Sequence, residues 1–165
     1  MIIRSKVIKY GDDINTDVIF PGRYLEIVDA QEMAKHAMED LDEKFHEKVK
    51  DAKIIVAGKN FGCGSSREQA ATCLKYAGVE AIVAKSFARI FFRNAINQGL
   101  VVIECKNVDD IEEGDELEID TDKGEIKNLS KGATYKIKPL PPFLAEIIKS
   151  GGLIPYMKRR VSNEI

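Results

Sequence analysis

Short apolar runs alternate with longer amphipathic segments through the middle of the chain. Residues 54–57, 81–84 and 100–104 are brief and rich in β-branched or small apolar side chains, which is typical of strands buried in a sheet. Residues 70–77 and 87–98 separate these runs, and each is predicted as a helix that ends at a glycine. Strands and helices in this alternation predict a parallel sheet with right-handed crossovers.

The two ends of the chain carry other patterns. Residues 3–9 alternate as a strand does, and residues 116–120 and 134–138 alternate strictly, with a hairpin turn predicted at 121–124. These segments predict an antiparallel section appended to the parallel sheet. A helix is expected over 29–40, with Asp29 as its N-cap, and a shorter one over 143–149. The tail around 157–160 is expected to be a solvated end.

Composition places the chain among ordinary globular proteins. Its 165 residues are 44% apolar and 32% charged, with a net charge of −2, and they are expected to form a single domain over residues 1–165. No basic block points to nucleic acid or to a membrane surface. The first residues do not resemble a signal peptide, and no apolar run is long enough to span a bilayer, so a cytoplasmic location is predicted.

A glycine loop follows the first buried run and carries the chemistry. Gly58, Gly62 and Gly64 lie between a predicted strand and a predicted helix. Glycine allows a ligand to approach the backbone, and a helix N-terminus attracts anions. Ser65 and Glu68 have the spacing of a capping box, and Arg67 offers donors suited to a carboxylate or a phosphate. The segment therefore indicates an anion site, although Ser65 and Glu68 would serve equally as a simple helix cap.

Other chemistries receive less support. The loop lacks the ending of a P-loop, and Arg67 occupies the place of the third glycine of a dinucleotide fingerprint. Cys63, Cys73 and Cys105 are an odd number without a CxxC pair, which predicts neither disulfides nor a zinc site. Three thiolates are enough in number for an iron–sulfur cluster with one open iron, but Cys73 and Cys105 fit small buried hydrophobes better.

Two further groups of polar residues have alternative interpretations. Asp12, Asp13 and Asp17 suggest a metal site or an acid–base pair, but a turn in which these side chains bond their own backbone is favoured. Lys85, Ser86 and Arg89 follow the second buried run, at the sheet edge where open α/β sheets bind ligands. Ser86 would cap the following helix and Arg89 would pair with a surface acid, while Arg93 and Asn94 are weaker candidates.

Residues 60–68, NFGCGSSRE, resemble the signature of the small subunits of isopropylmalate dehydratase, a branch of the aconitase superfamily. Residues 10–19 and 84–95 agree with the same family in order and spacing, so the resemblance covers essentially the whole chain. It implies an α/β fold, the swivelling β/β/α domain of the aconitase C-terminal region. It implies an enzyme, a hydro-lyase of leucine biosynthesis that interconverts 2-isopropylmalate and 3-isopropylmalate through isopropylmaleate. One departure is Gln69, where the family usually has a titratable His.

The resemblance also assigns roles to residues. Ser65 corresponds to the catalytic base, and Arg67 would hold a substrate carboxylate with Ser66 and Gly64, while Arg23 is a weaker second clamp. A specificity loop facing the variable end of the substrate corresponds to Tyr24, Leu25, Glu26 and Ile27. Glu26 would repel a third substrate carboxylate, unless it simply faces water.

The cofactor and partners are implied in the same way. No metal ligand is predicted in this chain, and the [4Fe-4S] cluster, whose open iron is the Lewis acid, is expected on a separate large subunit. The isolated small subunit is a candidate homo-oligomer. Two rivals stay open: the small subunit of homoaconitase or another alkylmalate dehydratase, and a stand-alone, non-catalytic anion-binding domain.

Overall fold

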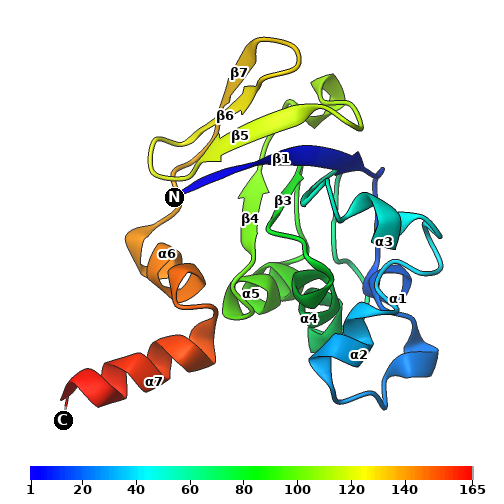
Figure 1. The fold of residues 1–165 in the computed structure, drawn as a ribbon, viewed down its shortest axis with the longest axis vertical. Coiled ribbons are helices and arrows are strands. Elements are labelled where there is room, and N and C mark those ends of the chain that lie inside the picture. Colours follow the sequence, from blue (N-terminus) through cyan, green and yellow to red (C-terminus); the bar gives the residue numbers. More distant parts are fainter. Residues whose placement is uncertain (165) are drawn as a thin grey trace.

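The computed structural model describes residues 1–164 of the chain, with side chains through residue 162. Within these residues, seven strands form one sheet in the order β4-β3-β2-β1-β5-β6-β7 (Figure 1). The strands are β1 (Ile2–Lys9), β2 (Ile54–Ala57), β3 (Ala81–Ala84), β4 (Val101–Glu104), β5 (Glu116–Asp120), β6 (Glu125–Asn128) and β7 (Ala133–Lys136). The predicted parallel sheet and the predicted antiparallel section are both confirmed.

Strand β1 belongs to both halves of the sheet. Its first residues pair antiparallel with β5, in a register that joins Ile2 to Asp120 and Lys6 to Glu116. Its last residues pair parallel with β2, beginning with Val7 opposite Ile54. A single strand therefore fixes the antiparallel section against the parallel strands, and apolar side chains from both halves share one core.

Helices connect the parallel strands, and two more follow the last antiparallel strand. In the described chain they are α1 (Thr16–Ile19), α2 (Ala30–Ala34), α3 (Phe45–Lys48), α4 (Glu68–Ala77), α5 (Arg89–Asn97), α6 (Pro142–Lys149) and α7 (Leu153–Glu164), with 3-10 turns η1 (Gly22–Tyr24) and η2 (Val108–Asp110). Helix α4 packs between α2 and α5 (Figure 1). Strands β2 and β3 are buried at every residue, as their continuous apolar runs predicted.

One sequence prediction about a helix was wrong. The helix expected over 29–40 is α2 alone, because the chain turns after Ala34 to bury Met38. Met38 has a φ of 60°, and its N–H donates to the carbonyl of Ile19 at 2.8 Å, which no helix could allow. Asp29 does cap α2, accepting from the N–H of Gln31.

Residues 157–160, expected as a solvated end, are exposed as expected, and they form part of helix α7, which extends away from the rest of the molecule (Figure 1). Tyr156 is buried and its ring meets Phe143 of α6 edge-on, which anchors this helix. Ile154, Met157 and Val161 are exposed along another side of α7. Among the described residues, no helix is both long enough and apolar enough to cross a membrane.

Candidate active site

The glycine loop, residues 58–67, lies at the carboxyl end of β2 and is paired along its length with the segment that leaves β1. Gly62 donates its N–H to the carbonyl of Ile14 at 2.7 Å, and Thr16 donates its N–H to the carbonyl of Cys63 at 2.8 Å. These bonds satisfy backbone groups that an isolated loop would leave to water. The two segments therefore hold each other in place at one edge of the sheet.

Gly62 permits a close contact between the loop and α5. Its φ is +83°, and a Cβ at this position would lie 2.2 Å from the ring of Phe91 on α5. Glycine is therefore required both for the backbone conformation and for the approach of α5. The neighbouring Phe61 exchanges backbone hydrogen bonds with the segment after β3, which brings the start of α5 to the same edge.

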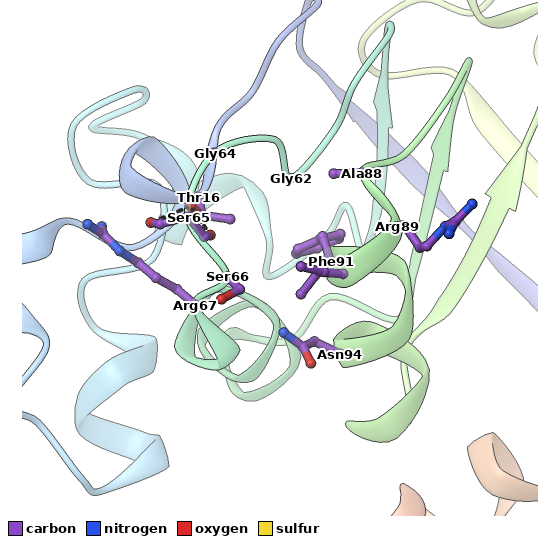
Figure 2. Close-up of a pocket in the computed structure, with 11 residues that line it drawn as sticks. Thr16, Gly62, Gly64, Ser65, Ser66, Arg67, Ala88, Arg89, Phe91 and Asn94 are labelled. Atoms are coloured by element: carbon purple, nitrogen blue, oxygen red, sulfur yellow. Dashed lines mark hydrogen bonds between the residues drawn. The ribbon is translucent and has the colours of Figure 1, made fainter.

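The starts of α4 and α5 both border one cavity of about 180 Å³ (Figure 2). The N-cap residues are Arg67 and Ala88, and neither gives its helix a side-chain cap. Free N–H groups and the partial positive charge of each helix start therefore favour an anion in this cavity. Its lining residues are Thr16, Gly62, Gly64, Ser65, Ser66, Arg67, Ala88, Arg89, Ile90, Phe91 and Asn94.

The capping box predicted from Ser65 and Glu68 is wrong, because α4 begins at Glu68 itself. Ser65 instead lies against Thr16 (Figure 2). The Thr16 hydroxyl donates to the Ser65 carbonyl at 2.7 Å, and the two hydroxyl oxygens are 3.4 Å apart. Since the Thr16 proton is directed to the carbonyl, the Ser65 hydroxyl is the donor in the contact between the two oxygens. Ser65 does not cap α4, and it is exposed at the cavity.

Arg67 is held by an acidic neighbour. Its Nη1 donates to Asp17 Oδ1 at 2.6 Å and to the Phe20 carbonyl at 3.1 Å. The hydrogen bond from Arg67, with a second from the N–H of Gly22, lowers the pKa of Asp17 below its ordinary value. Arg89 and Asn94 lie on one side of the cavity, and the Arg67 side chain points in the opposite direction (Figure 2).

The remaining predicted residues fall into two groups. Ser66 and Gly64 line the cavity, as do Arg89 and Asn94, although the Arg89 side chain points away from Ser65 (Figure 2). Lys85 is instead paired with Asp109, at 2.6 Å.

Arg23 and the predicted specificity loop are not brought into this cavity within the described chain. Arg23 makes a two-pronged contact with Asp40, at 2.7 and 2.9 Å, which raises the pKa of the guanidinium. Tyr24 stacks on His36 with ring centroids 3.7 Å apart. Leu25 and Glu26 are exposed and Ile27 is half-buried, on the turn that follows η1.

The loop before α1 makes only part of the self-contained turn expected from its sequence, since Asn15 Oδ1 accepts locally from the N–H of Val18 at 2.9 Å while two aspartates have distant partners. Asp12 Oδ1 accepts from the N–H of Lys59 at 2.8 Å, and Asp13 Oδ1 accepts from the Asn60 side chain at 3.0 Å. Ser86, expected to cap α5, accepts from the N–H of Asn60 at 2.8 Å. These side chains fix the glycine loop from both sides, which is a long-range role that local spacing does not encode.

The cysteines do not assemble into a ligand set. Cys73 is fully buried in α4 with its Sγ 3.2 Å from the Ala70 carbonyl, and burial raises the pKa of its thiol. Burial also raises the pKa of Cys105, while Cys63 is half-buried in the glycine loop. Within residues 1–164, no three His, Cys, Asp or Glu side chains are grouped so as to hold a metal ion. The three thiols therefore do not fit an iron–sulfur cluster.

Thr16, Asp17 and Phe91 are the site residues that sequence reasoning missed or assigned elsewhere. Thr16 contacts Ser65, Asp17 holds Arg67, and Phe91 fills the space over Gly62. The available signal was their position, since all three lie in the two stretches, 10–19 and 84–95, that carry the family resemblance.

The chain is similar to known proteins in sequence and in fold. The family model described as "Aconitase C-terminal domain" matches residues 12–108. The 3-isopropylmalate dehydratase small subunit of Thermodesulfovibrio yellowstonii is 54% identical over 165 residues, covering 99% of this chain and 98% of its own. Small subunit 1 of Archaeoglobus fulgidus is 58% identical over 150 residues, covering 91% and 93%. A crystal structure of 3-isopropylmalate dehydratase from Methanocaldococcus jannaschii superimposes with a TM-score of 0.93 at 50% identity, covering 99% and 98%.

Proposed function

Because the chain belongs to the family of 3-isopropylmalate dehydratase small subunits, which carry the aconitase C-terminal domain, we propose that it is the small subunit of such an enzyme. The enzyme interconverts 2-isopropylmalate and 3-isopropylmalate by removing and re-adding water, a step of leucine biosynthesis. The observation that supports this most directly in the molecule is that two uncapped helix starts and Ser65 border one cavity, with Arg67 in its lining and the Arg67 guanidinium held beside it by Asp17. A doubly anionic hydroxy acid is the ligand class that such a cavity favours.

Dehydration of isopropylmalate requires two events, removal of a proton and loss of the hydroxyl group. A C–H bond next to a carboxylate breaks, its electron pair forms the alkene, and the C–OH bond breaks at the neighbouring carbon. Ser65 is proposed to take the proton. A serine hydroxyl is a weak base, so its alkoxide needs stabilisation by fixed dipoles, which the amides at the start of α4 would supply. Arg67 is proposed to hold one substrate carboxylate, with Ser66 and the backbone at Gly64.

The site is proposed to be completed by a large subunit. The cavity of about 180 Å³ is smaller than the roughly 300–1,000 Å³ usual for ligand sites. A surface that closes over it would enlarge and dehydrate the site. The [4Fe-4S] cluster is proposed to reside on that partner, where it supplies the Lewis acid for the leaving hydroxyl. Arg23 and the turn Tyr24–Leu25–Glu26–Ile27 are proposed to meet the variable end of the substrate in the assembled enzyme.

The test is anaerobic reconstitution with the cluster-bearing partner. The assembled enzyme should convert 2-isopropylmalate, followed by the ultraviolet absorbance of the alkene and by product chromatography. A panel containing citramalate and homocitrate measures the preference. A higher kcat/KM for homocitrate would contradict the proposal in favour of homoaconitase, and ligand turnover by this chain alone would contradict the two-subunit enzyme.

A further inference from the structure

Asp17 contacts two parts of the molecule that the proposed reaction uses separately. A single oxygen, Oδ1, accepts from Arg67 Nη1 at 2.6 Å and from the backbone N–H of Gly22 at 2.9 Å. Gly22 begins η1, which leads directly into the turn proposed to meet the variable end of the substrate. Asp17 therefore lies between the carboxylate clamp and the specificity loop.

The contacts of Arg67 use only one end of its guanidinium. Both hydrogens of Nη1 are directed to protein acceptors, Asp17 Oδ1 and the Phe20 carbonyl. Among residues 1–164, no protein acceptor is found for Nε or Nη2. These two nitrogens form the planar edge that binds a carboxylate with two parallel hydrogen bonds.

The approach between Arg67 and the loop is close. A Cβ added to Gly22 would lie 3.3 Å from Arg67 Nη2 and 3.3 Å from Asp17 Oδ1. The Arg67 side chain is 20% exposed and that of Asp17 is 67% exposed, so the guanidinium is enclosed while the carboxylate stays wet. Asp17 therefore orients the partly enclosed Arg67 guanidinium. Because water reaches the Asp17 carboxylate and screens its charge, the guanidinium keeps its attraction for a second anion.

We propose that Asp17 is a positioning residue that fixes the Nη1 end of Arg67, so that the Nε–Nη2 edge is presented to a substrate carboxylate, and that ties this clamp to the specificity loop through Gly22. The inference rests on the proposed function, because it presumes that Arg67 binds substrate. It predicts that loop position and carboxylate binding are coupled through one side chain.

A competing role for Asp17 predicts the opposite change in KM when its carboxylate is removed. If Asp17 merely occupied Arg67 until substrate displaced it, removing the carboxylate would free the clamp and lower KM. If Asp17 positions Arg67, removing the carboxylate releases the guanidinium into several rotamers and raises KM. The direction of the change in KM therefore separates the two roles.

The experiment compares Asp17→Ala, Asp17→Asn and Arg67→Lys in the assembled two-subunit enzyme. Glu116→Ala is the matched control, since it removes another arginine–carboxylate pair, Arg4 Nε to Glu116 Oε1 at 3.2 Å, on the antiparallel section. We measure kcat and KM for 2-isopropylmalate, the kcat/KM ratio of 2-isopropylmalate to citramalate, and the melting temperature.

Asp17→Ala should raise KM about tenfold, change kcat by less than about threefold and lower the selectivity ratio. Asp17→Asn should raise KM less and keep the ratio, because an amide oxygen still accepts from Gly22 but holds Arg67 without charge. An unchanged or lower KM in Asp17→Ala would overturn the positioning role. Equal loss of selectivity in both variants would overturn the coupling through Gly22.

The control variants distinguish a failure of this inference from a failure of the proposed function. Glu116→Ala should leave kcat, KM and selectivity unchanged. A raised KM in Arg67→Lys together with a normal KM in Asp17→Ala would refute the positioning role of Asp17. Arg67 would then still be the residue that binds the substrate carboxylate. A normal KM in Arg67→Lys would refute the clamp, and with it the positioning role.

Discussion

Ser65 is exposed to the cavity, and its hydroxyl has no part in capping α4. Ser65→Ala should therefore leave stability within about 0.5 kcal/mol of the wild type while lowering kcat by about 10²–10⁴ in the assembled enzyme, since the proton acceptor is lost. Thermal unfolding and steady-state kinetics measure the two effects. Ser66→Ala is the contrast, and should raise KM more than it lowers kcat. A fully active Ser65→Ala protein would remove Ser65 from the chemistry.

Gly62 offers a test of packing at the same loop. Gly62→Ala should destabilise the fold by about 1–3 kcal/mol or more, because the new methyl group would overlap the ring of Phe91. Gly114→Ala separates this overlap from backbone strain, since Gly114 has a φ of +90° and no atom within 4 Å of the added Cβ. Urea unfolding of the two variants gives the difference, and equal destabilisation would mean that Phe91 moves aside at no cost.

At the scale of elements, Asp115 joins β5 to β6. It lies just before β5, and its Oδ2 accepts from the Asn128 side chain and from the N–H of Glu112, both at 2.9 Å. Burial raises the pKa of Asp115, but these bonds and Lys131 outweigh burial and hold the pKa below its ordinary value. Asp115→Ala should cost about 1–3 kcal/mol, because it leaves the buried Asn128 amide without its acceptor.

The lowered pKa of Asp115 makes its contribution to the stability of the fold depend on pH. The charged form of Asp115 is favoured by folding, so its contribution is present above an ordinary carboxyl pKa of about 4 and is lost as pH falls through the lower folded value. The stability difference between wild type and Asp115→Ala should therefore narrow in acid. Urea unfolding from neutral pH to pH about 3 measures this, with Glu118→Ala on the same strand as control. If the difference in stability between wild type and Asp115→Ala does not change with pH, the negative charge of Asp115 is not the source of that difference.

The specificity loop has its own test. Glu26→Arg should shift the kcat/KM ratio of homocitrate to 2-isopropylmalate toward homocitrate by about fivefold or more, because a repulsion becomes an attraction. Glu43→Arg, which changes another exposed acid outside the proposed specificity loop, controls for net charge. An unchanged ratio in Glu26→Arg would show that this side chain faces water in the assembled enzyme.

The local pattern of apolar and polar residues predicted the strands that are buried on both faces. It failed to predict the helix starts, where polar side chains bond to residues distant in the sequence. β2 and β3 match their apolar runs residue for residue, because both faces are buried. The helix starts near Ser65 and Ser86 were misplaced, because these serines contact Thr16 and Asn60 instead of capping. In the site, Ser65, Ser66 and Arg67 could be predicted from the glycine loop, but the part of Asp17 depends on a contact 50 residues away.

At the scale of the whole molecule, the site faces outward and the thiols face inward. Cys73 and Cys105 are buried in the core, so the purified chain, treated anaerobically with iron and sulfide, should gain no stable cluster and no dehydratase turnover. Only Cys63 should react quickly with a thiol reagent before unfolding. Visible absorption, iron content and activity are the measurements. A stable cluster with turnover in this chain alone would contradict the assignment of the cluster to a partner.

The double pairing of β1 also constrains how the chain can be made. Residues 2–6 leave the ribosome well before their partner strand, since the contacting Arg4 and Glu116 are 112 residues apart. Until β5 is synthesised, the nascent parallel half presents an open strand edge, and such an edge pairs readily with another chain. Late, non-local pairing also slows folding. A chain interrupted before residue 116 would thus carry most of the site residues and still be prone to aggregate through β1.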